Sequence, residues 1–147
     1  MCGFVGLFSE VDEFKGRELI QRSLINIKHR GPDGEGLKSY KFDNSYLIFG
    51  HKRLSILDLT DLANQPMETK DKNYSIIFNG EIYNYLELRE ILIKSGYVFK
   101  TNSDTEVLLN CWAKWGERSL DFLNGMFSFV ILDKQKNTIS FARDGYG

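Results

Sequence analysis

The sequence predicts an α+β fold in which helices cover antiparallel sheet. The expected elements run in the order strand, helix, further strands, two helices and a final hairpin. Grouping of this kind favours antiparallel sheet over a doubly wound parallel sheet. The chain has 147 residues, of which 42% are hydrophobic and 27% charged, as is typical of one ordinary globular domain. A disordered chain is excluded by the same values.

The first half of the chain predicts one strand, one helix and two short strands. Residues 2–8 alternate apolar residues with glycine, which is typical of a buried strand. Residues 46–50 and 53–57 are strand-like, and a polar connection follows over 58–66. Residues 16–29 carry apolar side chains at helical spacing, which predicts an amphipathic helix lying on a sheet: Ile20, Leu24 and Ile27.

The segment 30–36, with the sequence RGPDGEG, is a loop by composition. It superficially matches a glycine-rich dinucleotide-binding fingerprint. Pro32 lies inside it, however, and no helical pattern follows where the phosphate-binding helix would begin. We therefore predict no nucleotide site there, and we expect Arg30 and Asp33 to tie the loop to the sheet.

The second half of the chain opens with a strand and a helix. Residues 74–78 form a strong apolar strand that ends at Asn79-Gly80, a dipeptide typical of turns. Asn84 is placed to cap a helix over 85–95.

A further helix and a hairpin complete the chain. The residues at 103–106 are Ser-Asp-Thr-Glu, a capping box ahead of an apolar run that contains Cys111. In that run Cys111 is interpreted as a buried core thiol. Residues 126–132 and 138–143 flank a charged segment at 133–137, so they predict a hairpin.

Charge and composition limit the partners. Lys and Arg number 19 against 20 for Asp and Glu, a balance that argues against nucleic acid or an anionic membrane as the main partner. No apolar stretch approaches the roughly 20 residues that cross a bilayer, and no signal peptide is evident, so we predict a cytoplasmic protein. Without export, a disulfide between Cys2 and Cys111 is not expected. His29 and His51 have no second ligand at metal-binding spacing, so no metal is predicted.

Cys2 is a candidate nucleophile because of its position. It follows Met1, and a residue this small normally allows the methionine to be removed, which leaves the α-amine and the thiol on one residue. An α-amine has a pKa near ~8, so near neutral pH it can take the thiol proton and return it to a leaving amine. The resulting thiolate attacks carbonyl carbon readily. Position alone is equally typical of a small apolar residue that opens a strand.

The motifs that accompany Cys2 favour the catalytic interpretation. They are MCG at 1–3, RGPD at 30–33, HKRLSI at 51–56, FNGEIYN at 78–84 and SDTE at 103–106. Together they resemble the class II glutamine amidotransferase domain, an N-terminal-nucleophile hydrolase, and within that group the asparagine synthetases. The resemblance covers essentially the whole chain, so residues 1–147 are interpreted as one glutaminase domain. It implies a four-layer αββα sandwich of two antiparallel sheets between helices, with the nucleophile at the start of a central strand.

The resemblance also implies roles for the catalytic residues. Cys2 attacks the side-chain amide of L-glutamine, ammonia leaves, and water cleaves the glutamyl thioester that remains. Asn79 and Gly80 form the oxyanion hole, the first through its side-chain NH2 and the second through its backbone N–H. Arg53 grips the α-carboxylate of glutamine, which suits a planar guanidinium because it can form two parallel hydrogen bonds.

Two carboxylates and a short backbone segment complete the implied glutamine site. Asp104 receives the α-ammonium, and Glu81 lies in the same pocket. From the residues alone, Asp104 is also explained by the positive end of its helix, and Glu81 by a solvated turn. In the family the site is further lined by the backbone of four residues whose side chains here have the pattern of core residues: Leu54, Ser55, Ile56 and Leu57.

The chain departs from the family near its end. Gly145 stands where the family usually has a bulkier or charged residue. More strands then follow in the family, and after them a synthetase domain that binds ATP with Mg and activates aspartate. We therefore expect a domain truncated at its C-terminus and without a cofactor. Its ammonia would be used for asparagine synthesis by a synthetase domain, in cis or in trans.

Three alternatives stay open at this point. Similar domains serve enzymes that amidate surface sugars or polysaccharides. A non-catalytic glutamine-binding module is a second alternative. A different N-terminal-nucleophile amidohydrolase or peptidase is the third, and Arg53 and Asp104 argue against it because together they would recognise a free amino acid.

Overall fold

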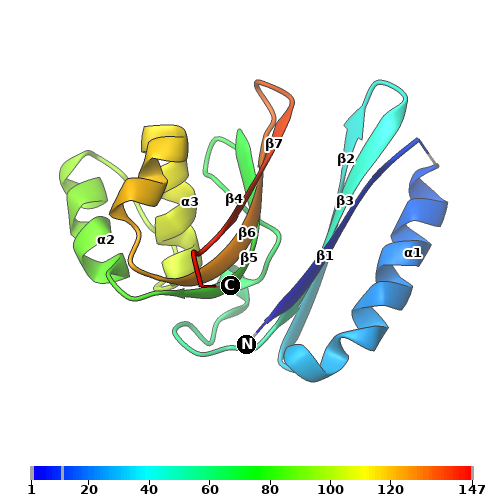
Figure 1. The fold of residues 1–147 in the computed structure, drawn as a ribbon, viewed down its shortest axis with the longest axis horizontal. Helices are drawn as coiled ribbons and strands as arrows, with labels where there is room; N and C mark the ends of the chain where they lie inside the picture. The colour runs from blue at the N-terminus through cyan, green and yellow to red at the C-terminus, as the bar shows by residue number, and fades with distance from the viewer. Residues whose placement is uncertain (1, 11, 147) are drawn as a thin grey trace.

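Two antiparallel sheets lie face to face between helices, which gives four layers (Figure 1). The computed structural model describes residues 2–10 and 12–146. Helix α1 covers one sheet and helices α2 and α3 cover the other, so the predicted αββα sandwich is confirmed. No helix of the described residues is long and apolar enough to cross a membrane.

The first sheet has the strand order β1-β3-β2. Apolar side chains of α1 pack on its outer face, among them Ile20 and Leu24 against Ile48. The helix begins and ends about three residues earlier than predicted, because the Asp12 side chain accepts a hydrogen bond from the backbone N–H of Lys15 and caps it. The elements of this half are β1 (Gly3–Ser9), α1 (Glu13–Asn26), the 3-10 turn η1 (Lys28–Arg30), β2 (Gly34–Phe42) and β3 (Ser45–Arg53).

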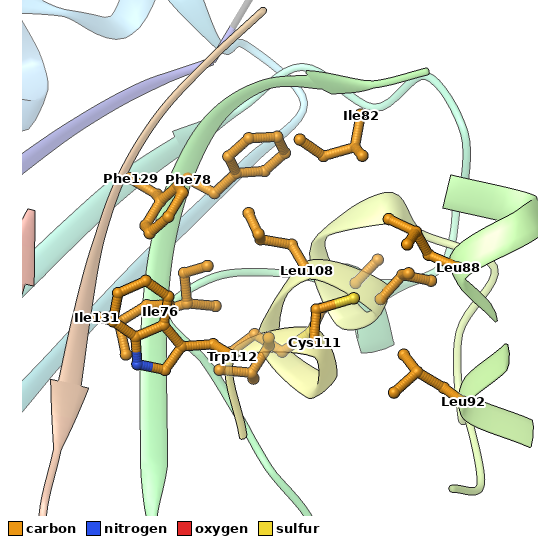
Figure 2. Close-up of a cluster of buried hydrophobic side chains, with 14 residues drawn as sticks. Ile76, Phe78, Ile82, Leu88, Leu92, Leu108, Cys111, Trp112, Phe129 and Ile131 are labelled. Carbon is orange, nitrogen blue, oxygen red and sulfur yellow. The ribbon is translucent and has the colours of Figure 1, made fainter. Parts of the chain in front are cut away.

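The second sheet has the strand order β4-β5-β6-β7. Side chains from its two central strands and from α2 and α3 form the largest buried cluster, in which Cys111 and Trp112 lie (Figure 2). A second cluster, which includes Phe49 and Ile77, fills the space between the sheets. The elements here are η2 (Asp61–Ala63), β4 (Met67–Glu68), β5 (Tyr74–Ile82), α2 (Tyr85–Lys94), α3 (Asp104–Trp115), η3 (Gly116–Phe122), β6 (Gly125–Asp133) and β7 (Thr138–Arg143).

Strand β2 was not predicted. The interpretation of 30–36 as a loop is therefore wrong from Gly34 onward, where pairing with β3 begins. Of the nine strand residues only Tyr40 is buried, so the strand lacks a clear apolar face. Gly36 is required because a side chain there would collide with the backbone of Gln65.

The predicted strand over 53–57 is also wrong. Strand β3 continues without a break to Arg53, and the next four residues leave the sheet. Ile56 and Leu57 are 65% and 36% exposed, so their side chains are not core residues as their pattern suggested. They line a cavity instead, which explains how apolar residues come to lie outside the core.

Asn79 and Gly80 do not form a turn. They lie within β5, where they pair with Ser128 and Phe127 of the next strand. Gly80 has a φ of 157°, and a side chain there would meet the backbone carbonyl of Met126. Only glycine allows β6 to approach β5 this closely. The Asn-Gly pair, which is typical of turns, is therefore explained here by packing between two strands.

The predicted caps are confirmed in part. Asn84 precedes α2, but its side chain bonds to the backbone of Phe122 and Asn124 rather than to the helix. Ser103 caps α3 by accepting a hydrogen bond from the N–H of Glu106. The hairpin predicted at the end of the chain is present as β6 and β7, and Cys111 is buried as predicted.

Candidate active site

Cys2 directly precedes β1 and lies against the end of β3. Its sulfur is 3.3 Å from the backbone nitrogen of Leu54, from which it accepts a hydrogen bond. The Arg30 side chain donates to the Cys2 carbonyl oxygen at 2.9 Å, which fixes the backbone of the first residues. Cys2 is half-buried, so it is not enclosed in the core as Cys111 is.

The loop that joins α1 to β2 is tied to the sheet, as predicted. A carboxylate oxygen of Asp33 accepts a hydrogen bond from the N–H of Ser55 at 2.8 Å, and the Asp33 N–H donates to the Arg53 carbonyl. Together with the Arg30 contact, these bonds confirm the structural interpretation of this loop. They also fix the backbone that follows β3 beside the thiol.

Two cavities meet at Cys2. The first, which we call the Arg53 cavity, is lined by Arg53, Gly80, Glu81 and Asp104 in addition to the cysteine. The second, the Asn79 cavity, is lined by Cys2 and Asn79 among others. The predicted site residues therefore gather around one thiol, although they lie on separate segments of the chain.

Four further residues were predicted to line the site with their backbone. Leu54, Ile56 and Leu57 do line the Arg53 cavity. Ser55 is not among its lining residues, because its N–H is directed to the Asp33 carboxylate.

One edge of β5 faces the Arg53 cavity. In an antiparallel ladder alternate residues direct their N–H and C=O groups to opposite edges, so Phe78, Gly80 and Ile82 point away from β6. The Phe78 N–H donates to the Gln65 side chain at 2.6 Å, and its carbonyl lies 3.1 Å from the ring nitrogen Nε2 of His51. The Ile82 N–H donates to Asp104 at 3.0 Å.

The Gly80 N–H is the one left without a protein partner on that edge, as far as the described residues show. Side chains satisfy the groups before and after it, where β4 no longer covers the edge. Because an uncommitted N–H next to a nucleophile is what an oxyanion hole requires, this arrangement supports the role predicted for Gly80.

The Asn79 side chain is similarly uncommitted. Its amide oxygen is buried and has no hydrogen-bond partner among the described residues. Buried polar atoms are normally paired. Its NH2 group likewise has no hydrogen-bond partner among the described residues, so this donor remains available to a molecule bound in the Asn79 cavity.

Arg53 is held in place by its own loop. Its guanidinium donates to the carbonyl oxygens of Thr60, at 2.8 Å, and Asp58, and to the Asn64 side chain at 3.1 Å. These bonds use three of its five N–H donors. Two donors remain without a partner within the described residues, enough for a bidentate bond to a carboxylate.

Asp104 is the buried acid of the Arg53 cavity. Removal from water raises its pKa from 3.8 to about 6, against the opposing effect of the hydrogen bond from Ile82, and the nearby charge of Glu81 raises it further. An added cation would favour the charged form of Asp104. It is the group best placed here to receive an ammonium.

The sequence prediction missed three residues around this site: His51, Asp58 and Gln65. All three are buried and polar. Burial lowers the pKa of His51 to about 4, and the charge of Arg53 acts in the same direction, so the ring is neutral and donates from Nε2 to the Phe78 carbonyl. A signal was present for Asp58, since Asp followed two residues later by Thr is typical of a side chain that organises its own loop.

No described residues form a group of three or more His, Cys, Asp or Glu side chains able to hold a metal. The sequence-based expectation of no metal was made on ligand spacing alone. Removal of Met1 falls on a residue outside the described part of the chain.

Comparison with known proteins decides the family. A family model for the glutamine amidotransferase domain matches residues 1–147. The chain belongs to this family. Across its whole length it is 45% identical to asparagine synthetase [glutamine-hydrolyzing] 1 of Bacillus subtilis and 39% identical to a putative asparagine synthetase [glutamine-hydrolyzing] 2 of Methanocaldococcus jannaschii. It spans 23% and 30% of the length of those two relatives.

Solved structures confirm the fold of this amidotransferase domain. Glutamine phosphoribosylpyrophosphate amidotransferase from B. subtilis superimposes with a TM-score of 0.76 over 98% of this chain and 37% of that one, at 21% sequence identity. The family model and the relatives confirm the predicted resemblance to class II amidotransferases, and the superposition confirms the predicted fold class. The roles of the individual site residues remain predictions.

Proposed function

We propose that the chain hydrolyses L-glutamine to L-glutamate and ammonia, with Cys2 as the nucleophile. The observation that carries the proposal is the meeting of the two cavities at the Cys2 thiol, with an uncommitted donor in each. Gly80 supplies a backbone N–H from the Arg53 cavity, and Asn79 supplies an amide group from the other. Membership of the glutamine amidotransferase family supports the same substrate.

The reaction would proceed in two balanced steps. Once Met1 is removed, the α-amine of Cys2 takes the thiol proton, and the sulfur forms a bond to the side-chain amide carbon of glutamine. Asn79 and Gly80 stabilise the negative charge on the amide oxygen. The C–N bond then breaks, and the amine returns its proton to the leaving ammonia. Water cleaves the glutamyl thioester in the second step and restores the thiol.

Recognition of the free amino acid would fall to the two sides of the Arg53 cavity. The two remaining donors of Arg53 bind the α-carboxylate, and Asp104 binds the α-ammonium, with Glu81 beside it. Opposite charges at a fixed spacing select glutamine over a peptide or a simple amide, which lacks one charge or both.

The ammonia would serve asparagine synthesis from aspartate. The asparagine synthetases that the chain resembles support this destination. A synthetase domain, in cis or in trans, would bind ATP with Mg and activate aspartate, and the chain itself would need no cofactor. We place the reaction in the cytoplasm.

The two cysteines provide a matched test. We expect Cys2→Ala to lower glutamate release by about 10⁴-fold or more, because removal of a covalent nucleophile leaves only binding and oxyanion stabilisation. Cys111→Ala removes the same atom from the core and should leave kcat unchanged. Mass spectrometry of the N-terminus establishes that Met1 has been removed from each protein.

Equal turnover by correctly processed wild type and Cys2→Ala would refute the proposal. Calorimetric binding of glutamine without ammonia release by the processed wild type would instead identify a non-catalytic glutamine-binding module.

A further inference from the structure

Asp58 connects the two sides of the Arg53 cavity. Its backbone carbonyl accepts a hydrogen bond from the Arg53 guanidinium. One oxygen of its side chain accepts from the Thr60 N–H at 2.8 Å and from the Thr60 hydroxyl at 2.6 Å. The other oxygen accepts from the N–H of Asn102 at 2.8 Å, 44 residues further along the chain.

Asn102 stands two residues before Asp104, at the entrance to α3. A single buried residue, 7% exposed, therefore touches both Arg53 and the segment that carries Asp104. The bond to Thr60 adds to this connection, because the Thr60 carbonyl accepts a second hydrogen bond from Arg53.

The Asp58 carboxylate is charged at working pH. Its hydrogen bonds, first those from Thr60 and then that from Asn102, lower its pKa, and the charge of Arg53 acts in the same direction. A charged acceptor makes stronger and shorter hydrogen bonds than a neutral one. The segments on either side of the cavity are thus joined by charge-assisted bonds.

We propose that Asp58 is a positioning residue for glutamine, and that it sets the spacing between Arg53 and Asp104. This inference rests on the proposed function, in which those two residues bind the α-carboxylate and the α-ammonium. Asp58 does not contact Cys2, Asn79 or Gly80 through any of its hydrogen bonds. Its influence falls on substrate binding rather than on the chemical step.

The test is Asp58→Asn, with Asp71→Asn as the matched control. Asp71 also accepts three hydrogen bonds, from a threonine hydroxyl and from the backbone and side chain of one asparagine, and its pKa is also lowered. It lies before the start of β5, whereas the oxyanion-hole residues lie near the other end of that strand. Loss of a loop carboxylate that accepts three hydrogen bonds is therefore common to both variants, whereas burial and the connection across the cavity belong to Asp58 alone.

We expect Asp58→Asn to raise the KM for glutamine about tenfold or more while kcat changes less than about twofold, because misplaced binding groups weaken binding and leave the nucleophile intact. Asp71→Asn should leave both parameters unchanged.

A second substrate separates positioning from a general structural role. 4-Carbamoylbutanoate is glutamine without the α-amine, so it uses Arg53 and not Asp104. If Asp58 sets the spacing of the two groups, the loss of kcat/KM in Asp58→Asn is several-fold larger for glutamine than for this analogue. An equal loss for both substrates, a fall confined to kcat, or a KM like that of Asp71→Asn would overturn the inference.

Thr60→Val tests the same inference about Asp58 if Asp58→Asn does not fold. It removes one of the three hydrogen bonds to the carboxylate and keeps the charge. We expect a smaller rise in KM, about two- to fivefold, and an unchanged KM would refute the inference. A wild type that releases no glutamate would refute the proposed function as well, whereas an active wild type with unaffected variants would refute the inference alone.

Discussion

The two cysteines lie in regions that differ in almost every physical respect. Cys111 of α3 is fully buried in the apolar cluster between the helices and the second sheet (Figure 2). Burial alone raises the pKa of its thiol to about 12. Cys2 is half-buried, accepts a hydrogen bond from a backbone N–H and adjoins two cavities. One residue type is thus a packing group in one region and a candidate nucleophile in the other.

Strand β5 and helix α3 connect the core region around Cys111 with the site region around Cys2. In β5, Ile76 and Phe78 belong to the core, while Asn79 and Gly80 face the cavities. In α3, the buried side chains beyond the first turn are apolar, and the first residue of the helix is the buried acid Asp104. The core therefore fixes the position of the polar ends, and the polar ends have little part in the core.

Thiol labelling should show the largest difference between the regions. At pH 8 a thiol with a pKa of about 12 is ionised in only about one molecule in 10⁴. We expect iodoacetamide to modify Cys2 of the native protein and to spare Cys111, with both modified after denaturation in urea. Peptide mass spectrometry over a time course measures the two rates. Comparable native rates would show that the core around Cys111 opens readily and that the contrast is false.

The core region was the easier one to predict from the sequence. The apolar run of α3, its capping serine and the hairpin at the end of the chain depend on local patterns, and all three are present in the structure. Hydrophobic periodicity reports which face of an element is buried, so it performs well where burial is the dominant effect.

Predictions from local patterns failed where tertiary contacts override local preference. Asn79-Gly80 has the sequence of a turn, yet its glycine is needed for the approach of β6 within a continuous strand. The apolar residues Ile56 and Leu57 have the pattern of a strand, yet they lie beside a cavity. Local propensity contains no information about the approach of β6 or about the cavity.

The site itself was predicted from the family motifs and not from periodicity. Those motifs identified residues that would contact a substrate, and the structure brings Cys2, Arg53, Gly80 and Asp104 together around one cavity. Residues that act only through others were missed. Gln65, for example, holds the Phe78 N–H from a loop 13 residues away, and nothing in its sequence neighbourhood indicates that contact.

Substitutions within β5 should also distinguish the site region from the core region, with a smaller difference than thiol labelling shows. We expect Asn79→Ala to lower kcat for glutamine by about 100- to 1000-fold, the usual effect of losing one oxyanion donor. Its unfolding midpoint should change little, because the amide oxygen has no partner among the described residues. Kinetics and thermal unfolding of the same preparation provide both measurements.

The control for Asn79→Ala is Ile76→Val, three residues earlier in the same strand. It removes one buried methyl group, which should cost about 0.5–1.5 kcal/mol of stability and leave kcat unchanged. If Ile76→Val lowers kcat as much as Asn79→Ala does, activity depends on the strand as a whole. The division of β5 into core residues and site residues would then be wrong.

The smallest expected effect is a dependence of the KM for glutamine on pH. It arises from Asp104, which is buried where the core region meets the site region. Burial raises its pKa to about 6, so protonation below that pH neutralises the group proposed to bind the α-ammonium. We expect the KM for glutamine to rise as the pH falls through 6, approaching tenfold per unit below it. Asp104→Asn should have a high KM throughout and no such dependence.

Stability should change in the opposite direction over the same pH range. The pKa of Asp104 is higher in the folded chain than the ordinary value of 3.8, so the folded state binds a proton more tightly than the unfolded state. This group therefore costs stability above pH 6, up to about 3 kcal/mol, and the cost is relieved as the pH falls from 6 toward 4. Urea unfolding of wild type and Asp104→Asn at matched pH isolates that contribution. If Asp104 instead stabilises the fold above pH 6 and this stabilisation is lost on acidification, its pKa is lowered in the folded chain, and the expected rise of KM through pH 6 is wrong.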